Sequence, residues 1–324
     1  MNELLLITKA NFSALMLDRG RIQQQSLGLT QSGPMDEYAF LWANKLLGND
    51  LNAACIEITF GKFSVKALQR CQLAITGANF NSRLNQDDLT NWGTISLLQG
   101  DELVFDGPKM NGTRAYLAIK GGFDCPRPFH SACTVQRENL GGFSSGKALQ
   151  VGEKLSSLTE QIQTQIVNVS VYPELIRAYN NKMTIHCRFI PACQWSLFSS
   201  QDQQRFLNQE YRIRSQSDRM GVRLEGDQLK PYSAGIISEG IALGAIQVPP
   251  DGQPIVLMRD RQTIGGYPKL GTVLSTDIEK IGQAMPGQKI QFHVSDIKTA
   301  YEERVKRERF FEPTNSALNN PHER

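Results

Sequence analysis

The sequence predicts a mainly β protein made of two β-rich units with a few short helices. Its 324 residues are enough for two domains that each bury a core. Glycine (27 residues) and proline (14 residues) separate many short runs rich in Ile, Val, Leu and Phe. Short strands with turn residues between them are typical of barrels and sandwiches rather than of alternating β and α elements. A similar pattern of strands also occurs once in each half of the chain.

The predicted strands follow one another through both halves. Each is a short apolar run, and Gly, Asn or Asp lies between several of them. They are Leu4–Thr8, Ile56–Phe60, Gln72–Thr76, Thr94–Leu98, Glu102–Phe105, Arg114–Ile119, Thr184–Ile190, Ile236–Ile241, Pro254–Met258, Gly271–Leu274 and Lys289–His293.

Helical periodicity is confined to a few segments. Pro34–Leu47 begins with a proline, which suits a first helical turn, and stops at Gly48. Thr276 and Glu279 have the spacing of a capping box, and we expect that helix to end before Pro286. Shorter helices are predicted at Pro173–Tyr179 and Ser200–Asn208.

A last helix is predicted from Ser295 onward. Ile297, Tyr301 and Val305 lie four residues apart, which predicts one apolar helix face. The residues that follow, 313–324, are expected to form a flexible tail.

Each half of the chain pairs a glutamate-bearing strand with a closing strand. Ile56–Gly61 precedes Gly100–Phe105 in the first half, and Ser238–Gly244 precedes Gly287–Phe292 in the second. We interpret these as two related units, an N-terminal one over 1–165 and a C-terminal one over 166–312. The segment Glu160–Pro173, dominated by Gln, Thr and Ser, marks the expected seam.

Composition and charge argue against several function classes. The net charge of +3, without a basic block before the C-terminal end, argues against a nucleic-acid-binding protein. Apolar runs such as Leu4–Ile7 are four residues long, whereas a membrane span needs about 20. Glu3 lies where a secretory signal would be basic. We therefore expect a cytoplasmic protein without nucleic-acid or membrane partners.

The six cysteines and four histidines do not have the spacing of metal ligands. A chain of this length needs no disulfide scaffold, so we expect free and mostly buried thiols in a reducing compartment. No metal site is predicted.

The most unusual segment follows the turn Pro249–Pro254. Ile255–Met258 is expected to be a buried strand, and Asp260, Arg261 and Lys269 come soon after it, around the pair Gly265–Gly266. Paired glycines allow backbone N–H groups to approach an anion, and the basic side chains add charge. The alternative is a structural turn with surface ion pairs, because the segment lacks the phosphate-loop pattern.

Two further segments are candidates. Ser32–Asp36 leads into a helix N-terminus, where free N–H groups suit an anion, although Ser32 acting only as the helix cap explains the same residues. Ser217–Gly226 is a further candidate site because it carries Arg219, Arg223 and Glu225. The alternative, a structural ion-pair network, is the commoner role of such residues.

Taken together, these motifs resemble one protein family. It is known as the KipA-type family, and its members are also described as the C subunit of 5-oxoprolinase, as allophanate hydrolase subunit 2 or as biotin-dependent carboxyltransferase-like. The resemblance covers about residues 10–293. It rests on Ser32–Asp36, Ala43–Asn49, Ile56–Glu57 and Thr76–Ala78 in the first half, and on Ser217–Gly226, Ser238–Gly240, Gly244–Pro249, Asp260–Thr263 and Gly265–Pro268 in the second.

The resemblance implies cyclophilin-like β-barrel units and a partner-dependent enzyme. The implied reaction is the ATP-dependent conversion of 5-oxo-L-proline to L-glutamate, together with a KipI-like B subunit and a LamB/YcsF-like A subunit. ATP with Mg would be bound by the complex, and no cofactor is evident in this chain. One alternative is urea or amide carboxyl transfer in a biotin-dependent system, although the chain has no Met-Lys-Met carrier segment. Another is a non-catalytic regulator that antagonises a KipI-like inhibitor of a sensor kinase.

Opening a lactam benefits from phosphorylation of its carbonyl oxygen, which calls for cations and oxyanion donors. On the resemblance, Arg261, Lys269 and the glycine amides would serve the phosphoryl group. Asp260 would hold the ring N–H and Arg219 the substrate carboxylate. The catalytic candidates are Asp260, Arg261 and Lys269, and the substrate-binding candidates are Ser32, Gly33, Asp36, Arg219, Gln262, Thr263, Gly265, Gly266 and Tyr267.

One stretch departs from the family pattern. Family members usually carry Ser-Arg-Ser-Thr where this chain has Ser131-Ala132-Cys133-Thr134. The resemblance therefore does not imply an arginine contact from that loop.

Overall fold

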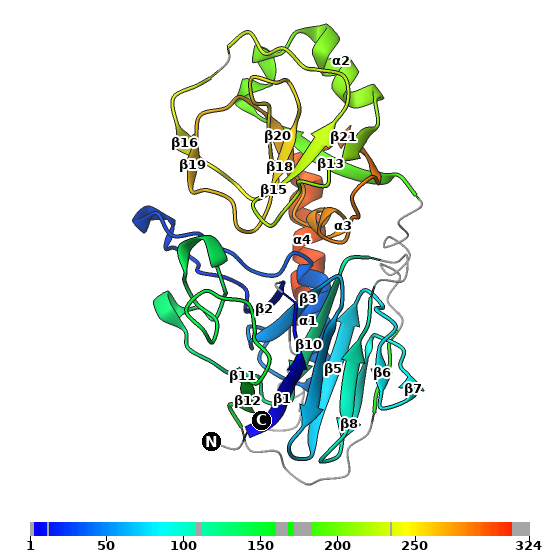
Figure 1. Cartoon of the computed structure of the whole chain (residues 1–324). Coiled ribbons are helices and arrows are strands. Elements are labelled where there is room, and N and C mark those ends of the chain that lie inside the picture. The colour runs from blue at the N-terminus through cyan, green and yellow to red at the C-terminus, as the bar shows by residue number, and fades with distance from the viewer. Residues whose placement is uncertain are drawn as a thin grey trace, which may run out of the picture.

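The chain forms two β-rich units joined along one face, with α1 and α4 beside the junction (Figure 1). The computed structural model describes residues 3–11, 13–107, 112–159, 168–171, 183–233 and 235–312. The mainly β fold with few helices confirms the predicted fold class. The predicted helix Pro173–Tyr179, most of the predicted seam and the predicted tail lie outside the described residues.

The N-terminal unit consists of two sheets. The larger has the order β11 (Phe123–Asp124), β12 (Lys154–Ser157), β1 (Glu3–Lys9), β4 (Phe63–Ala67), β9 (Glu102–Phe105), β6 (Arg83–Leu84) and β7 (Asp87–Asp88). The smaller has the order β2 (Ala14–Leu17), β3 (Cys55–Thr59), β10 (Arg114–Ile119), β5 (Cys71–Gly77) and β8 (Gly93–Leu97).

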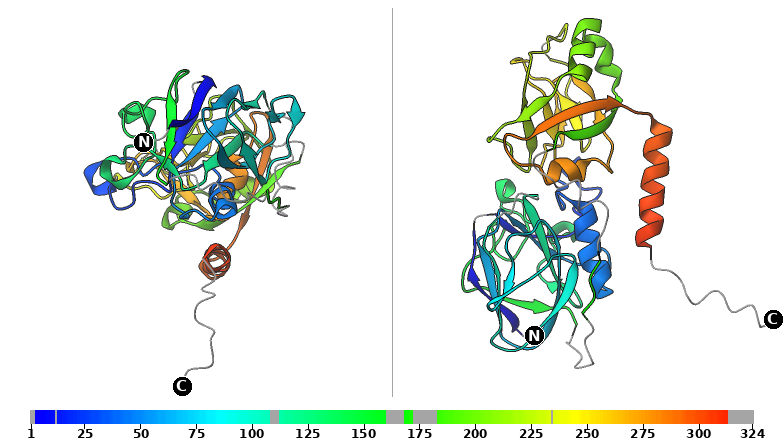
Figure 2. Two further views of the ribbon diagram at one scale, coloured as in Figure 1. Left: turned by 90° about the horizontal axis from the view of Figure 1, so that it is seen from below. Right: turned by 90° about the vertical axis from the view of Figure 1, so that its right-hand side faces the viewer.

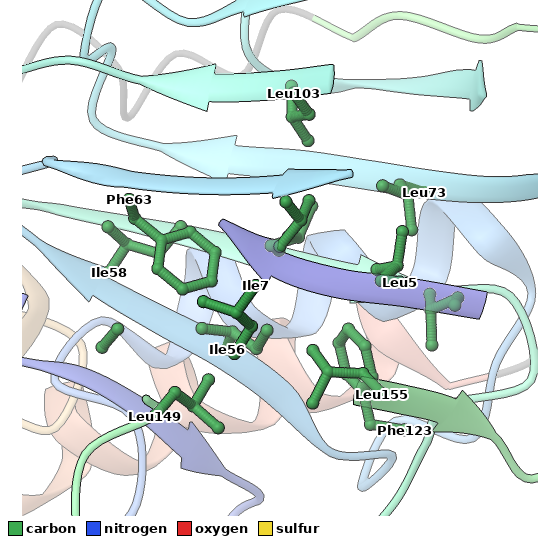
Figure 3. Close-up of a cluster of buried hydrophobic side chains, with 14 of the residues drawn as sticks. Leu5, Ile7, Ile56, Ile58, Phe63, Leu73, Leu103, Phe123, Leu149 and Leu155 are labelled. Carbon is green, nitrogen blue, oxygen red and sulfur yellow. The ribbon is translucent and has the colours of Figure 1, made fainter. Parts of the chain in front are cut away.

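The main core of this unit lies between the two sheets (Figure 3). Leu5 and Phe63 from the larger sheet pack with Ile56, Ile58 and Leu73 from the smaller one, and all are buried. Side chains alternate between the faces of a strand, so Ala74 on β5 points the other way, toward α1.

Helix α1 (Glu37–Leu47) covers the outer face of the smaller sheet. Because that sheet is buried on both faces, its central strands are nearly continuous apolar runs, which is why the sequence predicted them well. The helix begins three residues after Pro34, because the Asp36 carboxylate accepts a hydrogen bond from the Ala39 N–H at 2.9 Å. Asp36, and not Ser32, is therefore its N-cap.

The C-terminal unit is a closed barrel. Its order is β13 (Ile185–Pro191), β20 (Lys269–Val273), β17 (Ala245–Gln247), β18 (Ile255–Leu257), β15 (Gly221–Glu225), β14 (Tyr211–Ile213) and β21 (Lys289–Val294). Helix α2 (Ser200–Asn208) places Phe206 in its core, stacked on Phe292 with ring centroids 4.9 Å apart. Met35 of the N-terminal unit packs in the same core, so the two units share apolar packing.

Two expectations about the strands are wrong. The strand predicted at Ile236–Ile241 is reduced to β16 (Glu239–Gly240), which pairs only with β19 (Ile264–Gly265), outside the barrel. Glu57 lies in the five-stranded sheet, so the two glutamate strands do not occupy matching places. Within the predicted seam, Val171 donates its N–H to the carbonyl of Trp92 in the N-terminal unit at 2.8 Å.

The capping box predicted for helix α3 (Ile278–Gly282) is absent. Its N-cap is Asp277, whose carboxylate caps no backbone N–H of the helix. It binds the Arg188 guanidinium at 2.8 and 2.9 Å and the Lys280 side chain at 2.9 Å. Glu279 accepts hydrogen bonds from the Tyr38 N–H and from Arg307 rather than closing the box. Long-range ion pairs therefore replace local capping at this helix.

Helix α4 (Ile297–Phe311) leaves the barrel and descends beside α1 (Figure 2). Its predicted apolar face is wrong, because Ile297 and Tyr301 are 73% and 67% exposed. The inner side instead carries Arg307 and Phe311, and the Phe311 ring packs against Tyr38 of α1 with centroids 5.6 Å apart. Among the described helices, α4 included, we find none with the length and apolar character of a membrane span.

Removing the cap of α2 is expected to lower the free energy of unfolding by about 1 kcal/mol. The Ser199 hydroxyl accepts a hydrogen bond from the Asp202 N–H at 3.1 Å, and Ser199→Ala removes it. Urea unfolding of the two proteins measures the difference. Ser200→Ala is the matched control, because Ser200 is exposed and lies inside the helix. Equal losses in both variants would contradict the role of Ser199.

Candidate functional site

A buried polar cluster occupies the junction of the two units. Asp260 lies in the loop after β18, Arg219 lies just before β15, and Ser32 precedes α1. The Arg219 guanidinium donates to both Asp260 carboxylate oxygens, with Nε–Oδ2 at 2.9 Å and Nη2–Oδ1 at 3.1 Å. The Ser32 hydroxyl donates to Oδ1 at 2.7 Å. Three predicted site residues from distant parts of the chain are thus in direct contact.

Glu57 of β3 is the member of this cluster that sequence reasoning missed. Arg219 Nη1 lies 2.5 Å from its Oε1, and the Tyr116 hydroxyl donates to its Oε2 at 2.7 Å. Burial raises the pKa of Glu57, but Arg219 and Arg114 outweigh that effect, so its pKa is lowered and the carboxylate stays charged. A glutamate between Ile56 and Ile58 in a buried strand was the available signal, because a charge there needs a partner.

The contacts of Arg219 extend across the junction. Its Nη2 also donates to the Gly33 carbonyl at 2.7 Å, so all three guanidinium nitrogens are engaged. Asp260 and Glu57 raise the pKa of Arg219, although burial opposes them. A substrate carboxylate could bind this guanidinium only by displacing one of its present partners.

Arg261 is a buried cation without a carboxylate partner in the described part of the chain. It donates from Nε to the Ile241 carbonyl at 3.0 Å and from Nη2 to the side-chain oxygen of Gln31 at 3.2 Å. Burial and the neighbouring Arg259 lower the pKa of Arg261 to about 10, so it remains protonated at neutral pH. An anion therefore suits Arg261 better than it suits Arg219.

Asp36 belongs to the junction but does not contact Asp260. One of its oxygens caps α1, and the other accepts from Gln283 Nε2 after helix α3 at 2.8 Å. Its backbone N–H donates to the Tyr116 hydroxyl at 2.8 Å. Asp36 thus fixes α1 against the barrel rather than facing an open site.

The remaining predicted residues lie along the loop that follows Arg261. Lys269 pairs with Glu239. The Thr263 carbonyl accepts from the Ile241 N–H at 3.1 Å, while Gln262 is exposed and Tyr267 is 43% exposed. This loop and the segment 236–241 thus bind each other and do not converge on Asp260 as one site.

The backbone at Gly265–Gly266 does not have the left-handed conformation of an anion nest. Neither glycine has a positive φ, and Gly265 is paired in β19. A Cβ at Gly265 would lie 2.6 Å from Ile241 Cδ1, and one at Gly266 would lie 2.9 Å from the Ile236 carbonyl oxygen. The segment 236–241 packs directly against both positions and leaves no room for a side chain, which explains why both residues are glycine.

Glu37 links the two units through a second ion cluster. It binds Arg19 of its own unit at 3.0 Å and Arg259 of the barrel unit at 3.1 Å. Burial raises its pKa, but Arg259 and Arg19 outweigh this and lower the pKa to about 2. The folded-state value lies below the unfolded one, so the stabilisation is complete above pH about 4.5 and is lost as the pH falls through about 2.

We expect Glu37→Gln to lower the free energy of unfolding by about 2 kcal/mol at pH 7. The difference from the parent protein should shrink as the pH falls from 5 to 2. Urea unfolding at several pH values measures it, with Glu225→Gln as an exposed control that should match the parent. A difference independent of pH would contradict the ionic role of Glu37.

The chain is similar to known proteins over most of its length. The family model for the carboxyltransferase domain, subdomain A and B, matches residues 27–294. The C subunit of 5-oxoprolinase from Escherichia coli is 32% identical over 321 residues, which cover 98% of this chain and 99% of that protein. Urea amidolyase of Saccharomyces cerevisiae is 28% identical over 84% of this chain but only 16% of its own length. The solved structure of K. lactis urea amidolyase shares the fold, with a TM-score of 0.84 over 96% of this chain and 20% of that chain, at 24% identity.

Proposed function

Because the chain belongs to the carboxyltransferase-domain family of subdomains A and B, we propose that it is the C subunit of an ATP-dependent 5-oxoprolinase. Its reaction would convert 5-oxo-L-proline to L-glutamate. The observation that carries this proposal is the match to the Escherichia coli protein over nearly the full length of both chains. The urea amidolyase match covers only a small part of a much longer protein.

The proposed partners are a KipI-like B subunit and a LamB/YcsF-like A subunit. ATP and Mg²⁺ are assigned to the complex rather than to this chain alone. One feature supports that division: Glu57 and Asp260 are both bound to Arg219, so neither is a free carboxylate ligand for Mg²⁺. Arg261, by contrast, fits a phosphoryl oxygen.

Phosphorylation of the lactam carbonyl oxygen would activate the carbonyl carbon for attack by water. The ring C–N bond would then break, the nitrogen would take up a proton, and hydrolysis of the resulting acyl phosphate would release phosphate and glutamate. Arg261 would stabilise the charge on the transferred phosphoryl group, and Asp260 would accept a hydrogen bond from the ring N–H. Arg219 would act as a positioning residue, since it holds Asp260 and Ser32 from one side and Glu57 from the other. Lys269 would add positive charge at the phosphoryl group only after its ion pair with Glu239 breaks.

Glutamate release from 5-oxoproline and ATP tests the proposal. The chain is assayed alone, with the KipI-like partner, and with both proposed partners. We expect release only in the full mixture, because this chain is proposed to supply one part of the site. The absence of glutamate in every mixture, with the KipI-like partner still bound, would overturn the reaction and favour the regulatory role.

A second candidate is carboxyl transfer to urea or another amide. The fold shared with K. lactis urea amidolyase and the sequence match to the yeast enzyme favour it. This reaction would require separate biotin-carrier and carboxylase proteins. Urea-dependent consumption of a carboxylated biotin carrier, without any 5-oxoprolinase activity, would decide for this candidate.

A further inference from the structure

Arg21 is a second buried arginine next to the candidate site. It shares Gln31 with Arg261: the Gln31 carbonyl accepts the Arg21 backbone N–H at 2.7 Å, and the Gln31 side chain accepts Arg261. Arg21 is only 1% exposed. Figure 1 shows the dark blue loop after β2, where Arg21 lies, next to the green loops that follow β11, below the barrel.

The guanidinium of Arg21 is incompletely bonded. Its Nη2 donates to the Cys133 carbonyl at 2.5 Å, while the enclosed Nε and Nη1 have no hydrogen-bond partner among the described residues. No carboxylate of the described chain lies within 4 Å of it. A buried cation in this condition is unfavourable unless something compensates for its lost hydration.

The carboxylates of the surrounding loops are bound to other groups. Asp18 accepts from the Ser131 hydroxyl at 2.6 Å and from the Ala132 N–H at 2.7 Å. Glu138 accepts from the Thr30 N–H at 3.2 Å and from Arg137 at 3.0 Å. Neither is available to Arg21 without breaking these bonds.

We propose that Arg21 is an oxyanion-binding residue, which takes a carboxylate or phosphate oxygen at Nε and Nη1. Both anions offer the acceptors that a guanidinium prefers. Gly141 packs directly on the guanidinium, since a Cβ there would lie 2.4 Å from Nη2. The donors left for the anion are therefore Nε and Nη1. The inference concerns binding alone and stands whether or not the proposed reaction is correct.

Thermal unfolding of the full chain tests it with three probes at equal ionic strength: sodium chloride, inorganic phosphate and 5-oxo-L-proline. At about tenfold its Kd, a bound anion should raise Tm by roughly 2–4 °C over chloride. A rise with phosphate alone identifies a phosphate site, and a rise with 5-oxoproline alone identifies a carboxylate site. Equal Tm values in all three salts would overturn the proposal without any variant.

Arg21→Met separates Arg21 from the general positive charge of the region. We expect it to lose the anion-dependent rise in Tm while keeping, or exceeding, the parent Tm in chloride, because an unpaired buried charge has been removed. Arg137→Met is the matched control, with the same charge change in the neighbouring loop, and should keep the rise. An undiminished rise in Arg21→Met would overturn the proposal. If Arg21→Met does not fold, Arg21→Lys should show a smaller rise than the parent, and an equal rise would overturn it.

Discussion

Arg219→Met is expected to lower the free energy of unfolding by about 3–5 kcal/mol, the largest effect on stability that we expect from one side chain of the junction. The substitution leaves two buried carboxylates, Glu57 and Asp260, without their shared guanidinium. Arg114 lies 3.6 Å from Glu57 and compensates only in part, and Ser32 is left as the remaining side-chain donor to Asp260 among the described contacts. Urea unfolding at pH 7 measures the loss.

Arg223→Met is the control for this prediction. It has the same charge change four residues along the chain, where the side chain is exposed, and its effect should be below about 0.5 kcal/mol. Because Arg219 joins both units, its loss should also reduce cooperativity, with the two units unfolding in separate transitions. Equal stability of the two variants would show that the buried cluster contributes nothing net.

Arg261→Met is expected to reduce glutamate release by the reconstituted complex by about 10²–10³-fold. The proposed role of Arg261 is to stabilise charge on the phosphoryl group, and methionine supplies no charge or N–H donor. Stability should change by less than about 1 kcal/mol, because no described carboxylate pairs with Arg261 and none is left unpaired. Activity and stability are therefore expected to change independently at this position, unlike at Arg219.

The activity assay includes Arg261→Lys and Arg223→Met. Lysine keeps the charge but not the planar donor arrangement, so an intermediate rate is expected. Arg223→Met should retain the parent rate. Parent-like activity of Arg261→Met in a complex of normal composition would refute the assignment of Arg261.

Hydrophobic patterns in the sequence correctly predicted the strands that are buried along nearly their whole length. Strands β3, β5 and β10 are apolar on both faces because α1 covers one face of their sheet and the second sheet covers the other. Helix α4 shows the limit of the same reasoning. Four-residue spacing of Ile297 and Tyr301 indicated an inner face, but the packing of Phe311 on α1 and the Arg307–Glu279 ion pair turn that face to solvent.

The sequence by itself determined the mainly β class, α1, α2 and the candidate residues Ser32, Arg219 and Asp260. Secondary-structure propensity, hydrophobic periodicity and family motifs are all properties of short stretches of chain. Only the tertiary structure decided which charges meet. The Ser32–Asp260 hydrogen bond spans 228 positions and the Arg219–Glu57 contact spans 162. Such contacts depend on how two units dock, and a buried charge acquires its partner from whichever segment the docking brings within reach. That is why the roles of Glu57 and Arg21 emerge only at the junction.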